Sequence, residues 1–235
     1  MKRIVLVFLM FLFYIVLKSQ DIKLSLQTGY GFYDMSSLKD ITKSAMTQIP
    51  FVAKTIANYP PFLYYQPMIR FCGKNVEIGF LYTNQSTGSR ISSKDYSGEY
   101  RLDTRIHSNS PAVILNLTKD DFDNFKLWWS LKLGANFTSF KMTEYMHLTG
   151  GTTNENSTDL VAGALYFEPG VNISVPVNKF SIELNFAYQK EVFRNDLQTK
   201  DNPNEGISLK KNFMESDLWD GFRLGITVAY TLSGL

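Results

Sequence analysis

The sequence predicts an all-β fold: an eight-stranded antiparallel up-and-down β-barrel that crosses a membrane, with short periplasmic turns and long external loops. Three observations predict it. Apolar residues alternate with polar or small residues in eight successive segments, short and long connections alternate between these segments, and an export leader precedes the first of them. Alternation with a period of two puts one set of side chains on each face of a strand.

The first twenty residues have the order of parts of a secretory signal peptide. Lys2 and Arg3 precede an unbroken apolar run, residues 4–17, and polar residues follow it. This run is shorter than the roughly 20 residues that a membrane-crossing helix needs. We therefore expect a signal peptide at residues 1–19. We expect one domain at residues 20–235, because no linker or change of composition divides them.

Charge and cysteine content exclude several classes of function. Without Lys2, Arg3 and Lys18 of the leader, 21 basic residues stand against 22 acidic ones, so no basic patch argues for a nucleic acid partner. Cys72 is the only cysteine, and the chain has two histidines. An internal disulfide is therefore impossible, and a Cys/His zinc site lacks ligands. We expect no metal and no cofactor.

The clearest strand lies at the C-terminus, where apolar residues at even positions from 222 to 232 alternate with polar or small ones. The eight expected strands occupy about residues 22–32, 64–71, 76–83, 100–117, 125–138, 165–175, 180–189 and 222–233. Within 100–117 the apolar parity changes near Pro111. We interpret this change as a β-bulge or an interruption of the strand.

The connections are of two kinds that strictly alternate. Short ones are expected at 73–74, 118–124 and 178, and long polar ones at 34–62, 86–99, 143–158 and 194–216. In an up-and-down barrel each kind shares one rim. The first long connection also predicts a short helix from Ser37 to Met46, capped by Ser36 or Ser37 and stopped by Pro50. This segment is either a partner-binding lid or a loop folded onto its own barrel mouth.

The polar face of the strands is expected to point inward. It mixes small residues with charges of both signs, and the lumen of an eight-stranded barrel is just wide enough to be filled by side chains. Charges there must pair, because an unpaired buried charge is costly. The predicted lumen ionic network consists of Arg70, Glu77, Arg101, Asp103, Arg105, Lys126, Lys132, Glu168, Glu183 and Arg223. The alternative is a soluble lipocalin-like barrel, with the charged face in solvent and the apolar face inside.

With its leader, its eight alternating segments and its C-terminal strand Gly221–Leu232, the chain resembles the OmpA/OmpX-like outer-membrane β-barrel superfamily. The resemblance covers nearly all of the mature chain as a pattern and not as a diagnostic motif. It departs from many members at Ser233–Leu235, where those members end in an aromatic residue. It implies export to the outer membrane and contact with outer-membrane lipid, and we expect a monomer.

The histidines do not form a recognisable catalytic set. Lipid A deacylases resemble one another in a His-x-Ser arrangement, which puts both side chains on one face of a strand. Here Ser108 directly follows His107, so the two side chains face opposite ways, and His107 is expected to share the lumen with Asp103 and Arg105. His147 lies near Glu144 in a long loop, at a spacing typical of solvated residues.

The expected function is therefore non-enzymatic: an outer-membrane barrel with a filled lumen that serves envelope integrity, or surface recognition of a protein or other ligand through its loops. A filled lumen argues against a general porin, because wide aqueous channels need about 16 strands. Two alternatives stay open. One is a lipid-remodelling enzyme with its site at the outer rim, and the other is an accessory component of an export apparatus.

Overall fold

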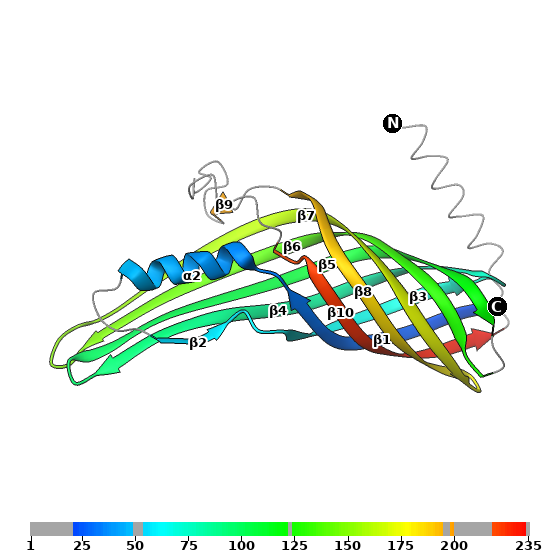
Figure 1. Ribbon diagram of the computed structural model, residues 1–235, viewed down its shortest axis with the longest axis horizontal. Helices are drawn as coiled ribbons and strands as arrows, with labels where there is room; N and C mark the ends of the chain where they lie inside the picture. The colour runs from blue at the N-terminus through cyan, green and yellow to red at the C-terminus, as the bar shows by residue number, and fades with distance from the viewer. Residues whose placement is uncertain (1–20, 49–53, 122–123, 195–197, 200–217, 234–235) are drawn as a thin grey trace.

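The computed structural model describes residues 21–48, 54–121, 124–194, 198–199 and 218–233, so the predicted leader lies outside the described residues. Eight antiparallel strands form a closed ring (Figure 1). They are β1 (Asp21–Tyr33), β3 (Phe62–Cys72), β4 (Val76–Asp95), β5 (Gly98–Asp121), β6 (Lys126–Leu148), β7 (Thr153–Val177), β8 (Phe180–Arg194) and β10 (Gly221–Ser233). The first and last strands close the ring, from Asp21 opposite Ser233 to Tyr33 opposite Gly221. The predicted eight-stranded up-and-down barrel is confirmed.

Two short strands and one helix lie outside the ring. Strand β2 (Lys54–Asn58) pairs with β4, and β9 (Gln198–Thr199) pairs with β7. Helix α2 (Ser36–Gln48) begins at the predicted cap and ends before Pro50, as the sequence predicts. Within the described part of the chain, no helix is long and apolar enough to cross a membrane.

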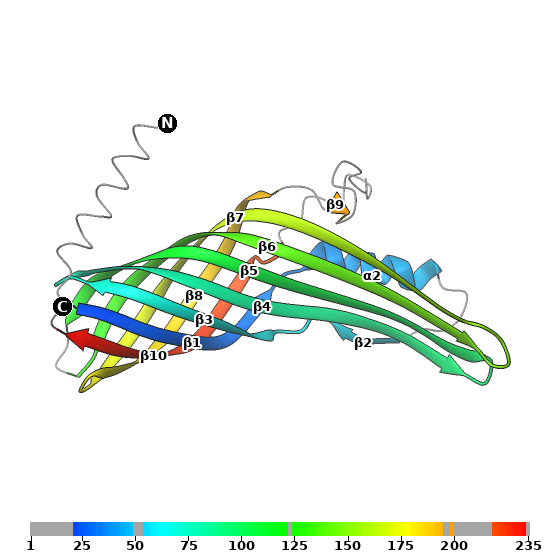
Figure 2. The ribbon, with the colours of Figure 1, turned by 180° about the vertical axis from the view of Figure 1, so that it is seen from behind.

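Two of the four predicted long loops are wrong, and most of a third, residues 194–216, lies outside the described residues. Residues 86–99 and 143–158 are mostly paired strand, because β4 to β7 run for 20, 24, 23 and 25 residues, against 13 for β1. A membrane-crossing strand needs about 9–11 residues, so these four strands continue beyond the barrel as one sheet, the strand extension (Figures 1 and 2). The sequence of the extension is as polar as that of a loop, because both faces of a hairpin that extends into water can carry polar side chains. Asp95 sets one tight turn by accepting the backbone N–H of Ser97 at 2.8 Å.

Of the two features predicted at Pro111, the bulge is wrong, whereas the pairing of β5 with β6 is interrupted at Ser110 and Pro111. The β4–β5 register runs without a shift from Val76 opposite Leu117 to Asp95 opposite Gly98, with Tyr82 opposite Pro111. Even-numbered side chains of β5 face inward on both sides of the proline. Only the outward-facing side chains change in kind. They are apolar on the side of Pro111 toward the short turns, called the lower side, and polar on the side toward the extension, called the upper side. The parity change therefore marks the upper edge of an apolar band.

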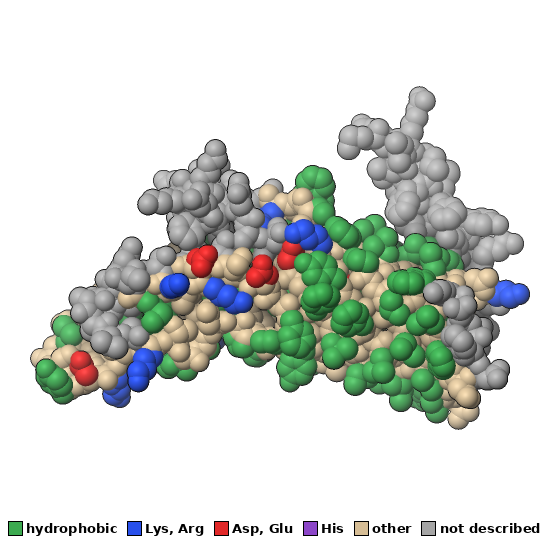
Figure 3. Space-filling model, in the orientation of Figure 1, with side chains coloured by type: hydrophobic (Ala, Val, Ile, Leu, Met, Phe, Trp, Pro, Cys, Tyr) green, Lys and Arg blue, Asp and Glu red, His purple; other side chains and the backbone are tan. Residues whose placement is uncertain are grey.

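The apolar band lies on the outside of the barrel. Phe186 and Ile226 are 55% and 51% exposed, whereas Arg223 is fully buried. In Figure 3 hydrophobic side chains cover the barrel half of the molecule, and most of the charged ones visible on this face lie toward the extension. The lipocalin-like alternative requires the reverse arrangement and is therefore wrong.

The upper mouth of the barrel is closed by an apolar cluster. Met35 and Leu38 pack at the start of α2 with Trp219, which precedes β10, and with side chains from the inner face of the extension. The remaining members of this cluster are Tyr33, Tyr59, Ile106, Phe140, Leu160 and Leu218. Its burial folds the first connection onto the barrel mouth.

Candidate functional site

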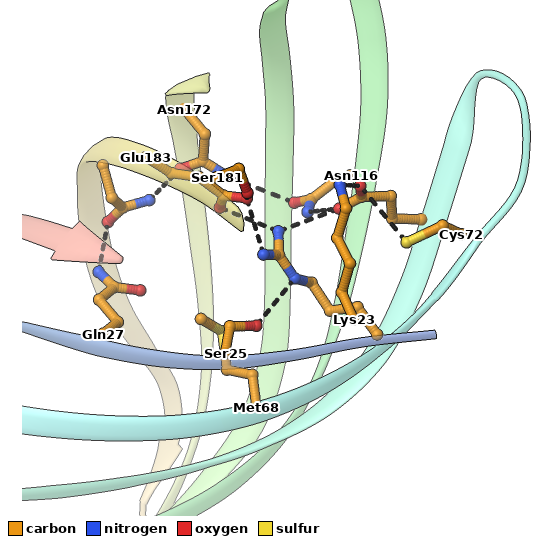
Figure 4. A network of polar contacts seen from close by, with 12 residues as sticks. Lys23, Ser25, Gln27, Met68, Cys72, Asn116, Asn172, Ser181 and Glu183 are labelled. Carbon is orange, nitrogen blue, oxygen red and sulfur yellow. Dashed lines mark hydrogen bonds and ion pairs between the residues drawn. The ribbon is translucent and has the colours of Figure 1, made fainter. Parts of the chain in front are cut away.

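The lower half of the lumen holds a charged network centred on Arg70 of β3. Figure 4 labels Lys23, Asn116 and Glu183 of this network. The guanidinium of Arg70 donates to Glu183 at 2.7 and 3.0 Å and to Glu77 at 3.0 Å. Lys23 lies 2.5 Å from the same Glu77 carboxylate, and Asn116 donates to it at 3.1 Å. All these side chains sit on the inward face of their strands, so the network follows from strand parity.

A second charged network fills the upper half of the lumen. Glu168 of β7 accepts hydrogen bonds from Lys132 at 2.8 Å and from Arg223 at 2.6 Å. Arg223 also donates to Gln85, and its guanidinium lies 5.2 Å from the ring centre of Tyr64. Lys132, Glu168 and Arg223 are each at most 1% exposed. One carboxylate therefore balances two buried cations.

Amide and hydroxyl side chains connect the two charged networks. Gln27 donates to Tyr64 at 2.7 Å and to Asn185 at 3.0 Å, while Gln66 donates to Gln27 at 2.9 Å. Thr83 donates to Gln66 at 3.0 Å. Each of these groups finds its partner inside the barrel, so hydrogen-bonded side chains fill the lumen between the two charged networks.

Trp219 seals the top of this filled lumen. Its ring is fully buried, its Nε1 donates to Thr138 at 2.9 Å, and it meets Tyr33 edge to face at 4.8 Å between ring centres. Next to it, the carboxylate of Glu191 accepts from the backbone N–H of Leu218 at 3.1 Å. The sequence did not single out these residues, because Trp219 precedes a strand and carries no periodic signal.

The structure places six of the ten predicted network residues inside the lumen, in two groups of three: Arg70, Glu77 and Glu183, and Lys132, Glu168 and Arg223. Lys126 also lies on an inward-facing position but is partly exposed at the lower rim. Gln27, Gln66 and Tyr64 were missed as network members. The two glutamines could have been predicted, because they stand at positions of β1 and β3 that face the lumen.

The assignment of Arg101, Asp103 and Arg105 to the lumen is wrong. These residues lie on the outward face of β5, above the apolar band, where Asp103 binds Arg90 at 2.5 Å and Arg101 at 3.2 Å. Odd positions of β5 face outward along the whole strand, and above the apolar band they carry polar residues because that face meets water. His107 shares this face and contacts Asn84 at 3.2 Å, so its predicted place in the lumen is wrong as well.

The histidines remain apart from a catalytic arrangement. Ser108 is buried on the inward face of β5, opposite to the face of His107. His147 contacts Thr153 at 2.9 Å, and Glu144, three positions before it on β6, falls on the other face of the strand. Among the described residues no cluster of His, Cys, Asp and Glu has the make-up of a metal site.

No protein-family model and no curated protein matches this sequence. Among solved structures, the outer membrane protein OprG from Pseudomonas aeruginosa is similar with a TM-score of 0.42 at 10% identity, over 92% of this chain and 98% of that one. The N-terminal β-barrel domain of Pseudomonas aeruginosa OprF gives 0.39 at 9% identity, over 91% and 98%. The outer membrane protease OmpT from Escherichia coli gives 0.38 at 10% identity, over 90% and 96%. Likenesses of this size say nothing about activity.

Proposed function

We propose that this chain is a non-conducting barrel of the outer membrane that holds the strand extension outside the cell for surface recognition. The observation that carries the proposal is the pairing of an apolar outer band with an ion-paired interior in one closed ring. Lipid accepts only structures whose backbone groups are satisfied internally, and a closed barrel meets this requirement. The apolar exterior needs a lipid environment, because exposed apolar patches of this extent are rare on soluble monomers.

The filled lumen supports a role other than transport. Arg70 and Glu183 cross it at one level, and Glu168 and Arg223 do so at a second level. An ion that passed would have to displace these buried pairs and leave charges without compensation inside the barrel, which is strongly unfavourable. We expect no ion conductance from the wild-type protein.

The strand extension supports recognition. Its four strands are hydrogen-bonded to one another up to their hairpin turns, from Ser86 opposite His107 to Asp95 opposite Gly98 in one hairpin. Such a surface is fixed before a partner arrives, so binding costs less conformational entropy than binding to a loose loop would. Tyr96, at the tip of this hairpin, is 93% exposed.

Cysteine labelling in intact cells tests which end faces outward. Cys72 is buried and is the only native thiol. We expect a membrane-impermeant maleimide to label Tyr96→Cys in intact cells. The matched control Lys179→Cys, in the turn at the opposite rim, should react only after the cells are permeabilised. The reverse pattern, or equal labelling of both, would contradict the proposal.

Recognition and envelope integrity are separable in a deletion strain. A variant that lacks residues 90–103 and 142–158, with each hairpin rejoined by a short turn, keeps the barrel and loses most of the extension. If recognition is the function, this variant inserts normally and restores the detergent resistance of the envelope, but it loses binding to the surface partner. Failure to restore resistance would assign the extension to envelope integrity. Altered lipid A in cells producing the wild-type chain, but not His107→Ala or His147→Ala, would instead favour an enzyme.

A further inference from the structure

A groove of about 580 Å³ lies on the outer wall of the extension, across β4 and β5. Residues 86–90 and 103–107 form its floor, and Gly88 leaves the centre of that floor without a side chain. Ile56 of β2 and Phe62 of β3 line it on the side away from β5, and they are 67% and 47% exposed. The groove therefore combines an apolar border with a polar floor, and its volume suits a small ligand or headgroup.

The groove lies directly above the apolar band. Asn109 of β5 is opposite Phe137 of β6, whose ring is 58% exposed on the outward face. Arg105 and Lys141 are the opposed pair four residues further along. Four residues span roughly 13 Å along a strand, and less along the membrane normal because barrel strands tilt by about 45°. The resulting height of about 9 Å above Phe137 puts Arg105 and Lys141 at the outer edge of the headgroup layer, which adds about 5–8 Å on each side of the hydrocarbon core.

The wall around the groove carries an excess of positive charge. Arg105 lines the groove, and Lys141 of the neighbouring strand β6 stands directly opposite it, just beyond the lining; both side chains are exposed. Within the described residues, neither makes an ion pair, although like charges in this position destabilise a sheet. An anion that binds both side chains would relieve this repulsion.

The neighbouring charges do not cancel the excess. Arg90 and Arg101 share the single carboxylate of Asp103, which Arg90 contacts through two of its nitrogens. Asp159 is the residue opposite Lys141 on β7. Next to the groove, Arg90, Arg101, Arg105 and Lys141 therefore stand with the carboxylates of Asp103 and Asp159, while Glu155 lies further along the same outward face. Arg90 is held in place at the edge of the groove.

We propose that this groove binds the phosphate-bearing headgroup of a lipid in the surrounding leaflet, and the inference rests on the proposed function because it requires this end of the band to meet a membrane. Arg105 and Lys141 contact the phosphate, and Ile56 and Phe62 contact the apolar part next to it. Charge-assisted hydrogen bonds from a guanidinium and an ammonium to phosphate are among the strongest in proteins. A lipid is the occupant that fits, because the groove lies next to the lipid-facing band, with only the Asn84–Asn109 pair between them, and because Ile56 and Phe62 give it an apolar border.

Native mass spectrometry of the full chain in detergent tests the proposal with lipid A that carries two phosphates as the probe. We expect the wild type to retain this lipid and to retain the same lipid without phosphates at least fivefold less. Arg105→Gln/Lys141→Gln should lose retention at least fivefold. The matched control Lys94→Gln/Lys179→Gln removes two exposed lysines far from the groove and should retain the lipid as the wild type does.

A second variant distinguishes a loss of lipid binding from a loss of folding. Ser86→Glu places a carboxylate in the groove, keeps all the cations, and should also lose retention, and heat-modifiable gel migration reports whether each variant folds. Equal retention by the folded Arg105→Gln/Lys141→Gln variant, equal retention of the lipid without phosphates, or full displacement by an equal concentration of inorganic phosphate would overturn the lipid site. The Tyr96→Cys labelling pattern is independent of these outcomes. A lost lipid site with normal labelling leaves the proposed function standing, whereas inverted labelling removes both.

Discussion

Arg70 and Glu183 join across the lumen through two hydrogen bonds, of 2.7 and 3.0 Å, although 113 positions separate them in the sequence. They stand on β3 and β8, which β1 and β10 separate in the ring. In the folded ring their contact therefore spans the seam at which the first and last strands pair. One buried ion pair therefore both fills the lumen and links the strands on either side of the β1–β10 pair that closes the barrel.

Removing the central cation of this network should destabilise the barrel strongly. Arg70→Met leaves Glu77 and Glu183 with less compensation in a buried site, and loss of one partner of a buried pair costs about 3–5 kcal/mol. Urea-dependent unfolding in lipid vesicles, followed by gel migration, measures the free energy of unfolding. The triple variant Arg70→Met/Glu77→Gln/Glu183→Gln should be more stable than Arg70→Met alone. A triple variant less stable than the single one would show that the carboxylates are not the cause.

The carboxylates of the two networks should differ in importance. Glu168 is the carboxylate that Lys132 and Arg223 share, whereas Arg70 keeps Glu183 when Glu77 is replaced. We therefore expect Glu168→Gln to lower the free energy of unfolding by more than Glu77→Gln does, with Glu155→Gln, on the exposed end of β7, close to the wild type. The same unfolding assay gives the order. Equal losses for the two buried sites would contradict the assignment of separate networks.

The strands and the inward charges of the barrel were predictable because both depend on parity alone, as at Arg70 and Arg223. Parity could not place Arg105, because it tells which residues share a face but not whether lipid or water covers that face. The change at Pro111 contained this information and was open to two readings, a bulge or the edge of the membrane. Trp219 and the contacts of α2 were not predictable, since they depend on where irregular segments return in space.

The loss of unfolding free energy caused by an added charge should be large within the apolar band and small beyond its upper edge. Leu133 and Thr143 both lie on the outward face of β6, below and above Phe137. A lysine on the lipid face costs about 2–4 kcal/mol near the midplane and about 0–1 kcal/mol near the interface. We expect Leu133→Lys to destabilise the protein by an amount in the first range and Thr143→Lys by an amount in the second. Equal costs in vesicles would place the edge elsewhere.

Tyr100 gives the extension a pH dependence that can be measured. Burial, the negative charge of Glu144 and a hydrogen bond to that carboxylate raise the pKa of Tyr100 from 10.0 to about 12. Because the folded pKa lies above the unfolded one, the stabilising contribution is complete below pH 10 and is lost as the pH rises through 12. The ultraviolet difference titration of wild type against Tyr100→Phe should therefore show a tyrosine with a midpoint near 12.

Replacing the carboxylate tests the cause of this shift. Glu144→Gln removes the negative charge beside the phenol and should move the midpoint of Tyr100 downward, though not fully to 10.0, because burial is the larger cause. Glu155→Gln removes a carboxylate of the same extension that faces the opposite side of the sheet, and should leave the midpoint unchanged. A midpoint that responds equally to both variants would mean that the general charge of the extension, and not the contact between Glu144 and Tyr100, sets the pKa.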